Sequence, residues 1–112
     1  MTLCEIEKVL KAKCFTSQDL EKRTATACCG ADLLSDVLAF THTNSLLLTG
    51  LIHPQVIRTA EMLDLVAVIF VRGKEPTPAM IALAEEKDIP VLSTPFTMFE
   101  ACGLLYAEGL GC

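Results

Sequence analysis

Short apolar segments alternate with amphipathic ones along this chain of 112 residues, and the alternation restricts the fold more than any other feature. The short segments are apolar, small or β-branched at every position, which is typical of parallel strands buried by helices. They are the four expected strands, at 24–28, 45–49, 66–71 and 90–92. A helical pattern follows each of them, at 31–40, 53–63, 79–87 and 97–107. The sequence therefore predicts a single α/β domain with a mostly parallel four-stranded sheet flanked by helices.

A helical segment over residues 1–22 is expected to precede the core of the domain at 24–110. Thr2 and Glu5 stand three residues apart, which is the pattern of a capping box, and they open a helix over 2–11. Residues 13–22 are polar and irregular, with a short helix expected at 17–22. The sequence leaves open whether the first helix packs on its own domain or on another subunit.

The net charge of −5 excludes two classes of partner. Proteins that bind nucleic acids show a basic patch, whereas the nine Lys and Arg residues of this chain are scattered. We therefore expect no nucleic-acid partner, and for the same reason no anionic membrane surface. No apolar run reaches the length of a transmembrane helix, and the acidic first ten residues do not resemble a signal peptide. Together these features predict a cytoplasmic protein.

Six cysteines invite a metal or disulfide interpretation, but their spacing favours neither. The chain contains no C-x-x-C pair and only two histidines, so we expect no metal site and no cofactor. In a reducing compartment the cysteines are expected to be mostly buried thiols. Those with the best prospect of reactivity are the adjacent pair Cys28 and Cys29 and the terminal Cys112. A cysteine-based redox protein is therefore kept as an alternative function.

A ligand site is expected where the strands end, because open parallel sheets bind ligands beyond the carboxyl ends of their strands. Glycines, hydroxyls, one acid and two bases gather there, and together they would suit an anionic small molecule such as a nucleotide. The same residue types also serve ordinary turns and helix caps, which is the competing interpretation. The candidate ligand-binding residues are Asp32, Thr49, Gly50, Arg72, Gly73, Lys74 and Thr97.

Known catalytic motifs are missing from the sequence. Gly73-Lys74 is followed by Glu75 and lacks the earlier glycine of a P-loop, and neither G-x-G-x-x-G nor G-x-S-x-G occurs. Asp32 and Asp36 lie four residues apart on one helical face, but no base accompanies them at a fixed spacing. We therefore expect no catalytic residue, and a chain that is not an enzyme.

Five segments of the chain, in order and spacing, resemble the DRTGG domain family. They are 31–39 (ADLLSDVLA), 48–51 (LTGL), 58–61 (RTAE), 72–74 (RGK) and 97–100 (TMFE). The resemblance covers residues 24–110 and implies a non-catalytic α/β module, found alone, with CBS domains in regulated pyrophosphatases, or in phosphotransacetylase-type enzymes. The fold also resembles the N-terminal domain of HPr kinase/phosphorylase, without its P-loop domain. The family's recurring residues fall at Asp36, Arg58, Thr59 and Gly73.

Two functions follow from these features. The first is a regulatory, ligand-sensing domain that binds an anionic metabolite or nucleotide as a homodimer. The second is a purely structural interaction module that dimerises or docks on a partner enzyme. Apolar residues make up 52% of the chain, more than one small core needs, and this excess favours a second copy as partner in both cases.

Overall fold

The computed structural model describes residues 1–111, with the side chain of Phe40 left out. Helices and strands alternate along it. In chain order the elements are α1 (Leu3–Val9), β1 (Lys13–Cys14), the 3-10 helix η1 (Leu20–Lys22), β2 (Ala27–Gly30), α2 (Leu34–Phe40), β3 (Ser45–Thr49), α3 (Pro54–Met62), β4 (Ala67–Phe70), α4 (Pro78–Glu86), β5 (Val91–Ser93) and α5 (Met98–Ala107).

The strands form one sheet in the order β1-β5-β4-β3-β2. Strands β2 to β5 are parallel to one another, which confirms the predicted α/β class and its four parallel strands. The fifth strand, β1, was not expected. It pairs antiparallel with β5 through Lys13–Ser93 and Cys14–Leu92, and the Phe15 N–H extends the pairing by donating to the Val91 carbonyl at 2.9 Å.

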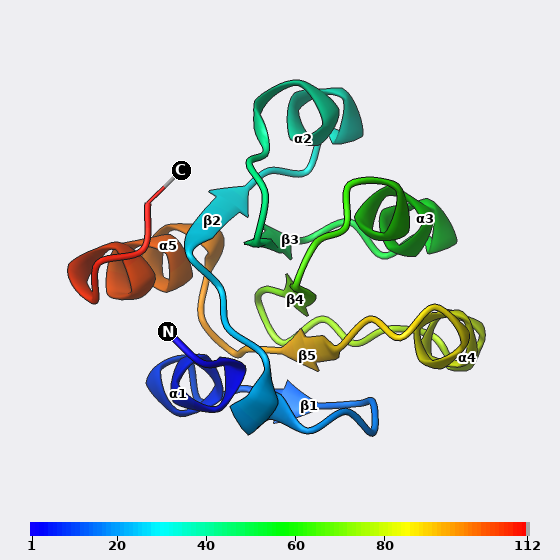
Figure 1. Cartoon of the computed structure of the whole chain (residues 1–112), viewed down its shortest axis with the longest axis horizontal. Helices are drawn as coiled ribbons and strands as arrows, with labels where there is room; N and C mark the ends of the chain where they lie inside the picture. The colour runs from blue at the N-terminus through cyan, green and yellow to red at the C-terminus, as the bar shows by residue number, and fades with distance from the viewer. Residues whose placement is uncertain (112) are drawn as a thin grey trace.

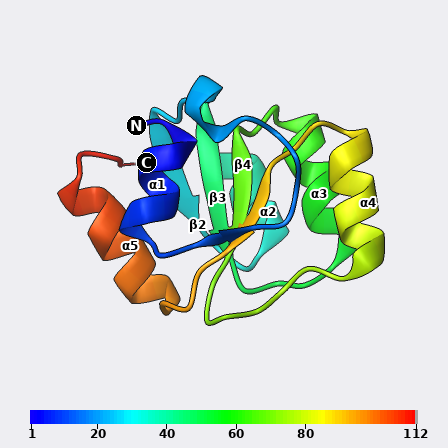
Figure 2. The same cartoon turned by 90° about the horizontal axis from the view of Figure 1, so that it is seen from below.

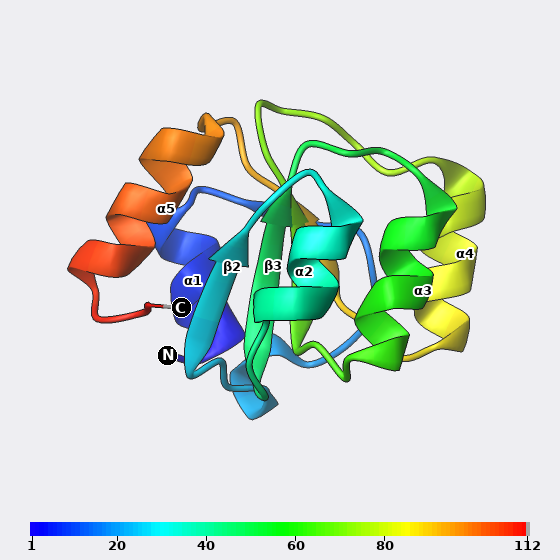
Figure 3. The ribbon, with the colours of Figure 1, turned by 90° about the horizontal axis from the view of Figure 1, so that it is seen from above.

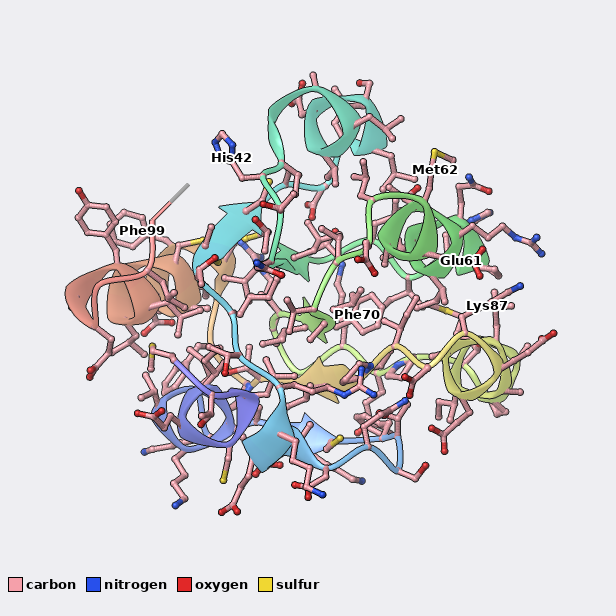
Figure 4. The ribbon with its side chains drawn as sticks, viewed as in Figure 1. His42, Glu61, Met62, Phe70, Lys87 and Phe99 are labelled. Carbon is pink, nitrogen blue, oxygen red and sulfur yellow. The ribbon has the colours of Figure 1, made fainter. Side chains whose placement is uncertain are left out.

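Helices cover both faces of the sheet (Figure 1). Because β2, β3, β4 and β5 are neighbours in chain order, right-handed crossovers place α2, α3 and α4 on one face. Helix α5 turns to the opposite face and lies beside α1 there, as Figure 2 shows. Figure 4 shows Phe70, which is fully buried, in the layer between β4 and helices α3 and α4. The described helices include none with the length and apolar character needed to cross a bilayer.

The N-terminal helix packs on its own domain, which settles the question that the sequence left open. Leu3, Ile6 and Leu10 are each 0% exposed and belong to the core on the α5 side of the sheet. The Thr2–Glu5 capping box is present at the start of α1, as predicted. An ion pair between Arg23 and Asp88 at 2.8 Å ties the end of this segment to the α4–β5 turn, and the bond lowers the pKa of Asp88.

Several predicted boundaries are wrong, and each error has a local cause. Strand β2 begins at Ala27 instead of residue 24, because Thr24 and Ala25 pair with the N-terminus at Thr2 and Met1. The expected helix at 17–22 is only the 3-10 turn η1. The helix expected from 31 begins at Leu34, because the Asp32 side chain is bonded to the neighbouring loop and does not enter the helix. Figure 3 shows the loop between β2 and this helix, α2.

Candidate functional site

The carboxyl ends of β2, β3, β4 and β5 lie along one edge of the molecule, since these strands are parallel. The helices that follow β4 and β5 cover opposite faces of the sheet, so the chain diverges between these two neighbouring strands (Figure 1). In open α/β sheets such a divergence is where ligands bind. The loops at this edge, 31–33, 50–53, 71–77 and 94–97, hold the candidate residues.

Asp32 binds the loop after β3. Its Oδ1 accepts a hydrogen bond from the Gly50 N–H at 2.7 Å and another from the Thr49 hydroxyl at 3.1 Å. Thr49 Oγ1 in turn accepts from the Leu51 N–H at 3.2 Å, so two side chains hold the beginning of that loop. Thr49 is fully buried, whereas Asp32 is exposed at the surface. The sequence thus placed Asp32, Thr49 and Gly50 together correctly.

Lys74 reaches the same loop from the loop after β4. Its Nζ donates to the Gly50 carbonyl at 2.9 Å, and its own carbonyl accepts from the Ser93 hydroxyl at 2.6 Å. A Cβ on Gly50 would stand 3.5 Å from both Lys74 Nζ and Asp32 Oδ1. An acid and a base therefore flank Gly50 on one side, and among the described residues they do not close into an ion pair.

Arg72 and Gly73 form a tight turn between β4 and Lys74. Their φ angles are +61° and +68°, and the Lys74 N–H donates to the Val71 carbonyl at 3.2 Å, which is the pattern of a type I′ turn. Arginine is disfavoured at positive φ, so surrounding contacts must hold it there. The Arg72 N–H donates to the Phe96 carbonyl at 2.7 Å and the Gly73 N–H to the Thr94 carbonyl at 2.8 Å. These bonds join the loops after β4 and β5 and leave the Arg72 side chain exposed.

Thr97 is a helix cap rather than an open ligand group. Its hydroxyl oxygen accepts from the Glu100 N–H at 3.2 Å, and the Thr97 hydroxyl donates to the Glu100 carboxylate at 3.0 Å. Thr77 caps α4 in a similar way, and His53 Nδ1 accepts from the Gln55 N–H at the start of α3. The starts of α3, α4 and α5 are thus capped by side chains, so an anion beside them would meet loop amides and the two cations; the N-cap residue of α2, Leu33, makes no side-chain cap bond. The contacts of Thr97 are therefore those of a helix cap, which was the alternative to a ligand-binding role.

The sequence model of the DRTGG domain matches residues 5–107 of the chain. The chain belongs to the DRTGG domain family. Its structure is similar to a structure of the CBS and DRTGG domains of the regulatory region of Clostridium perfringens pyrophosphatase, complexed with the activator diadenosine tetraphosphate. The TM-score is 0.72 at 20% identity, and the match covers 93% of this chain and 45% of that one. This DRTGG domain thus spans less than half of the chain it matches. No curated protein matches it.

The three residues that the family pattern added stand on helices and not in the strand-end loops of this DRTGG domain. Asp36 is exposed on α2 and Arg58 is exposed on α3. Thr59 is 2% exposed and packs under α3, where it is part of the core. Gly73 alone of the family positions is in the cluster around Lys74. The assignment of a common role to Asp36, Arg58 and Thr59 stays a prediction.

The two adjacent cysteines of the domain point to opposite faces of β2. Cys28 packs with α1 and α5, and Cys29 packs on the α2 side. A Cβ on Gly30 would stand 2.7 Å from Cys102 Sγ, so the absence of a side chain at Gly30 lets α5 approach the end of β2. Cys28 and Cys102 line a cavity of about 460 Å³. Cys112 lies outside the described residues.

Two polar residues at this edge were overlooked or undervalued. Thr94 is fully buried, donates to the Leu10 carbonyl at 2.6 Å and accepts from the Phe96 N–H, so it links α1 to the loop after β5. Ser93 holds the Lys74 backbone. The available signal was a pair of hydroxyl residues at the end of a short apolar strand, where buried polar groups need partners.

Proposed function

We propose that this DRTGG domain is a non-catalytic regulatory module that binds an anionic metabolite or nucleotide at the loops after β2 to β5. The observation that carries the proposal is the contact of Lys74 with the glycine-containing loop at Gly50, with the exposed Arg72 two residues before it in the loop after β4, where the chain diverges. Lysine and arginine next to loop N–H groups are the donors that bind phosphate and carboxylate groups.

A nucleotide is the ligand class that the comparison favours. The similar regulatory region from C. perfringens was solved in complex with a nucleotide activator, and it contains a DRTGG domain together with CBS domains. At 20% identity the likeness concerns the fold, so the nucleotide is part of this proposal and rests on the cations at the strand ends. A domain of this kind would report ligand binding to a partner enzyme in the cytoplasm and would need no catalytic group.

A thermal-shift screen against adenine, guanine and uridine nucleotides, with and without magnesium, tests this function. A ligand at about one hundred times its dissociation constant adds about 2.7 kcal/mol to the stability of the native state. In a domain near this size the melting temperature should then rise by about 10 °C. A rise with one nucleotide class supports the proposal. A flat screen across all classes, confirmed by a lack of heat in calorimetric titration, would contradict the nucleotide as ligand.

The outer surface of α5 favours a homodimer as the working form. Phe99 and Tyr106 are 87% and 75% exposed, and Figure 4 shows Phe99 on the outer side of the helix. A hollow of about 380 Å³ lies next to Phe99, lined by Phe96, Glu100, Gly103 and Leu104. Exposed aromatic anchors beside a hollow are typical of interface centres, and a two-fold axis would let each copy fill the hollow of the other. The same surface would serve the alternative function of docking on a partner enzyme.

Substituting Phe99→Asp is expected to convert the protein to a monomer, because it places a charge beside the hollow on the α5 surface. Light scattering at micromolar concentration measures the change in mass. Met62→Asp is the matched control, since Met62 is 67% exposed on α3 on the other face of the sheet (Figure 4). A monomeric unsubstituted protein would contradict the homodimer and leave the partner enzyme as the occupant of this surface.

A further inference from the structure

Asp32 occupies the hydrogen-bond donors that an anionic ligand would use. Its carboxylate accepts from a backbone N–H, at Gly50, and from a hydroxyl, at Thr49, and the Lys74 ammonium lies on the same side of Gly50. An amide N–H, a hydroxyl and an ammonium around one point are a set of donors that a phosphate group also recruits. The carboxylate of the protein thus stands where an external anion would find its best donors.

We propose that Asp32 is an internal competitor for the phosphate group of the ligand, and that its displacement releases the loop between β2 and α2. This inference rests on the proposed function and adds its regulation. It also changes the role of Asp32, which the sequence suggested as a ligand contact. Two anions cannot share the Gly50 N–H, and they would repel each other beside it, so binding of one requires departure of the other.

Helix α2 is weakly attached apart from this contact, which is why the release would be felt there. The helix has seven residues, its N-cap residue Leu33 makes no side-chain cap bond, and Val37 is its one buried side chain among those described. The bonds of Asp32 to Thr49 and Gly50 hold the chain just before it, together with the Ala31 N–H bond to the Leu48 carbonyl at 3.0 Å. Losing the Asp32 bonds removes two of these three ties.

The consequence is a change of surface at α2. Leu33 and Leu38 are 61% and 48% exposed on this segment, so a shift of α2 alters an apolar surface that a partner would contact. Short segments with few buried contacts open locally at low cost, and ligand-dependent motion draws on such segments. Binding at the strand ends would thereby be converted into a signal at one side of the sheet.

The test compares inorganic phosphate and pyrophosphate binding by the unsubstituted protein, Asp32→Asn and Asp32→Ala, by calorimetric titration. Asn keeps an oxygen on the Gly50 N–H but loses the charge, whereas Ala vacates the donor. We expect affinity to rise from the unsubstituted protein to Asp32→Asn and further to Asp32→Ala, by about tenfold or more overall, because a charge-assisted bond no longer has to be broken. Asp64→Asn, at an exposed position before β4 on the opposite edge, is the control for loss of one negative charge.

Amide hydrogen exchange of residues 33–40 gives the second readout. Addition of phosphate to the unsubstituted protein should speed exchange there, and Asp32→Ala should exchange fast without any ligand. If the unsubstituted protein binds phosphate and Asp32→Ala binds it no more tightly, the competitor role is overturned while the proposed function stands. If no variant, including Asp32→Ala, binds phosphate or pyrophosphate, the site and the competitor role fail together. If phosphate binds but does not speed amide exchange at residues 33–40, the release of α2 is overturned.

Discussion

Substituting Ile6→Ala is expected to lower the free energy of unfolding by about 2–5 kcal/mol, the cost of deleting a large side chain from a packed core. Ile6 is 0% exposed and lies in the cluster that joins α1 to β3, β4 and α5. The expected loss is as large as for a residue of the central strands, because α1 covers one face of the sheet and is anchored by the bond from Thr94 to the Leu10 carbonyl. Urea unfolding measures it.

Lys8→Ala is the matched control, since Lys8 is exposed on the same helix and its removal should change stability by no more than about 0.5 kcal/mol. If Ile6→Ala lowers the free energy of unfolding by no more than Lys8→Ala does, α1 contributes little to the stability of the domain. In that case the sheet would have to be stable with one side partly uncovered. The burial of Leu3 and Leu10 beside Ile6 argues against it.

The parallel part of the fold was predictable from sequence because its signals are local. Strands β3 and β4 are apolar at every position, and Pro54 and Pro78 stand at the first turns of their helices. Strand β1 has no such signal. Lys13 and Cys14 become a strand only by pairing with β5, which lies about eighty residues further along the sequence. Helix ends were also hard to place, since Lys11, Asp64 and Asp88 adopt positive φ after three helices where a glycine would have been the usual signal.

The candidate site was predictable as a place but not as a set of contacts. Parallel strands bring their carboxyl ends together whatever the strand order, so Asp32, Gly50 and Lys74 could be expected near one another. Whether a hydroxyl faces a ligand or caps a helix depends on side-chain rotamers, which the pattern does not contain; Thr97 caps α5. The role of Asp32 as an acceptor for the Gly50 N–H likewise depends on the order of β2 and β3 in the sheet, which the sequence left open.

Removing both cations of the site, by Arg72→Ala with Lys74→Ala, is expected to weaken nucleotide binding by about a hundredfold or more. Each charge-assisted hydrogen bond to an anion contributes about 1.5–3 kcal/mol, and the double substitution removes both donors. Alanine at position 72 is as strained as arginine at the φ of +61°, so the turn keeps its backbone and the comparison isolates the charge. Calorimetric titration with the nucleotide identified by the thermal-shift screen measures the change.

The double variant Lys8→Ala with Lys22→Ala removes the same net charge from exposed positions on α1 and η1. Because long-range attraction of an anion responds to net charge, this control measures that contribution separately from direct contact. A weakening equal to that of the Arg72 and Lys74 variant would show that the ligand is attracted without being held at the strand ends. A weakening restricted to Arg72 and Lys74, with single substitutions of intermediate effect, would place the anion beside Gly50 and make Asp32 the residue that it must displace.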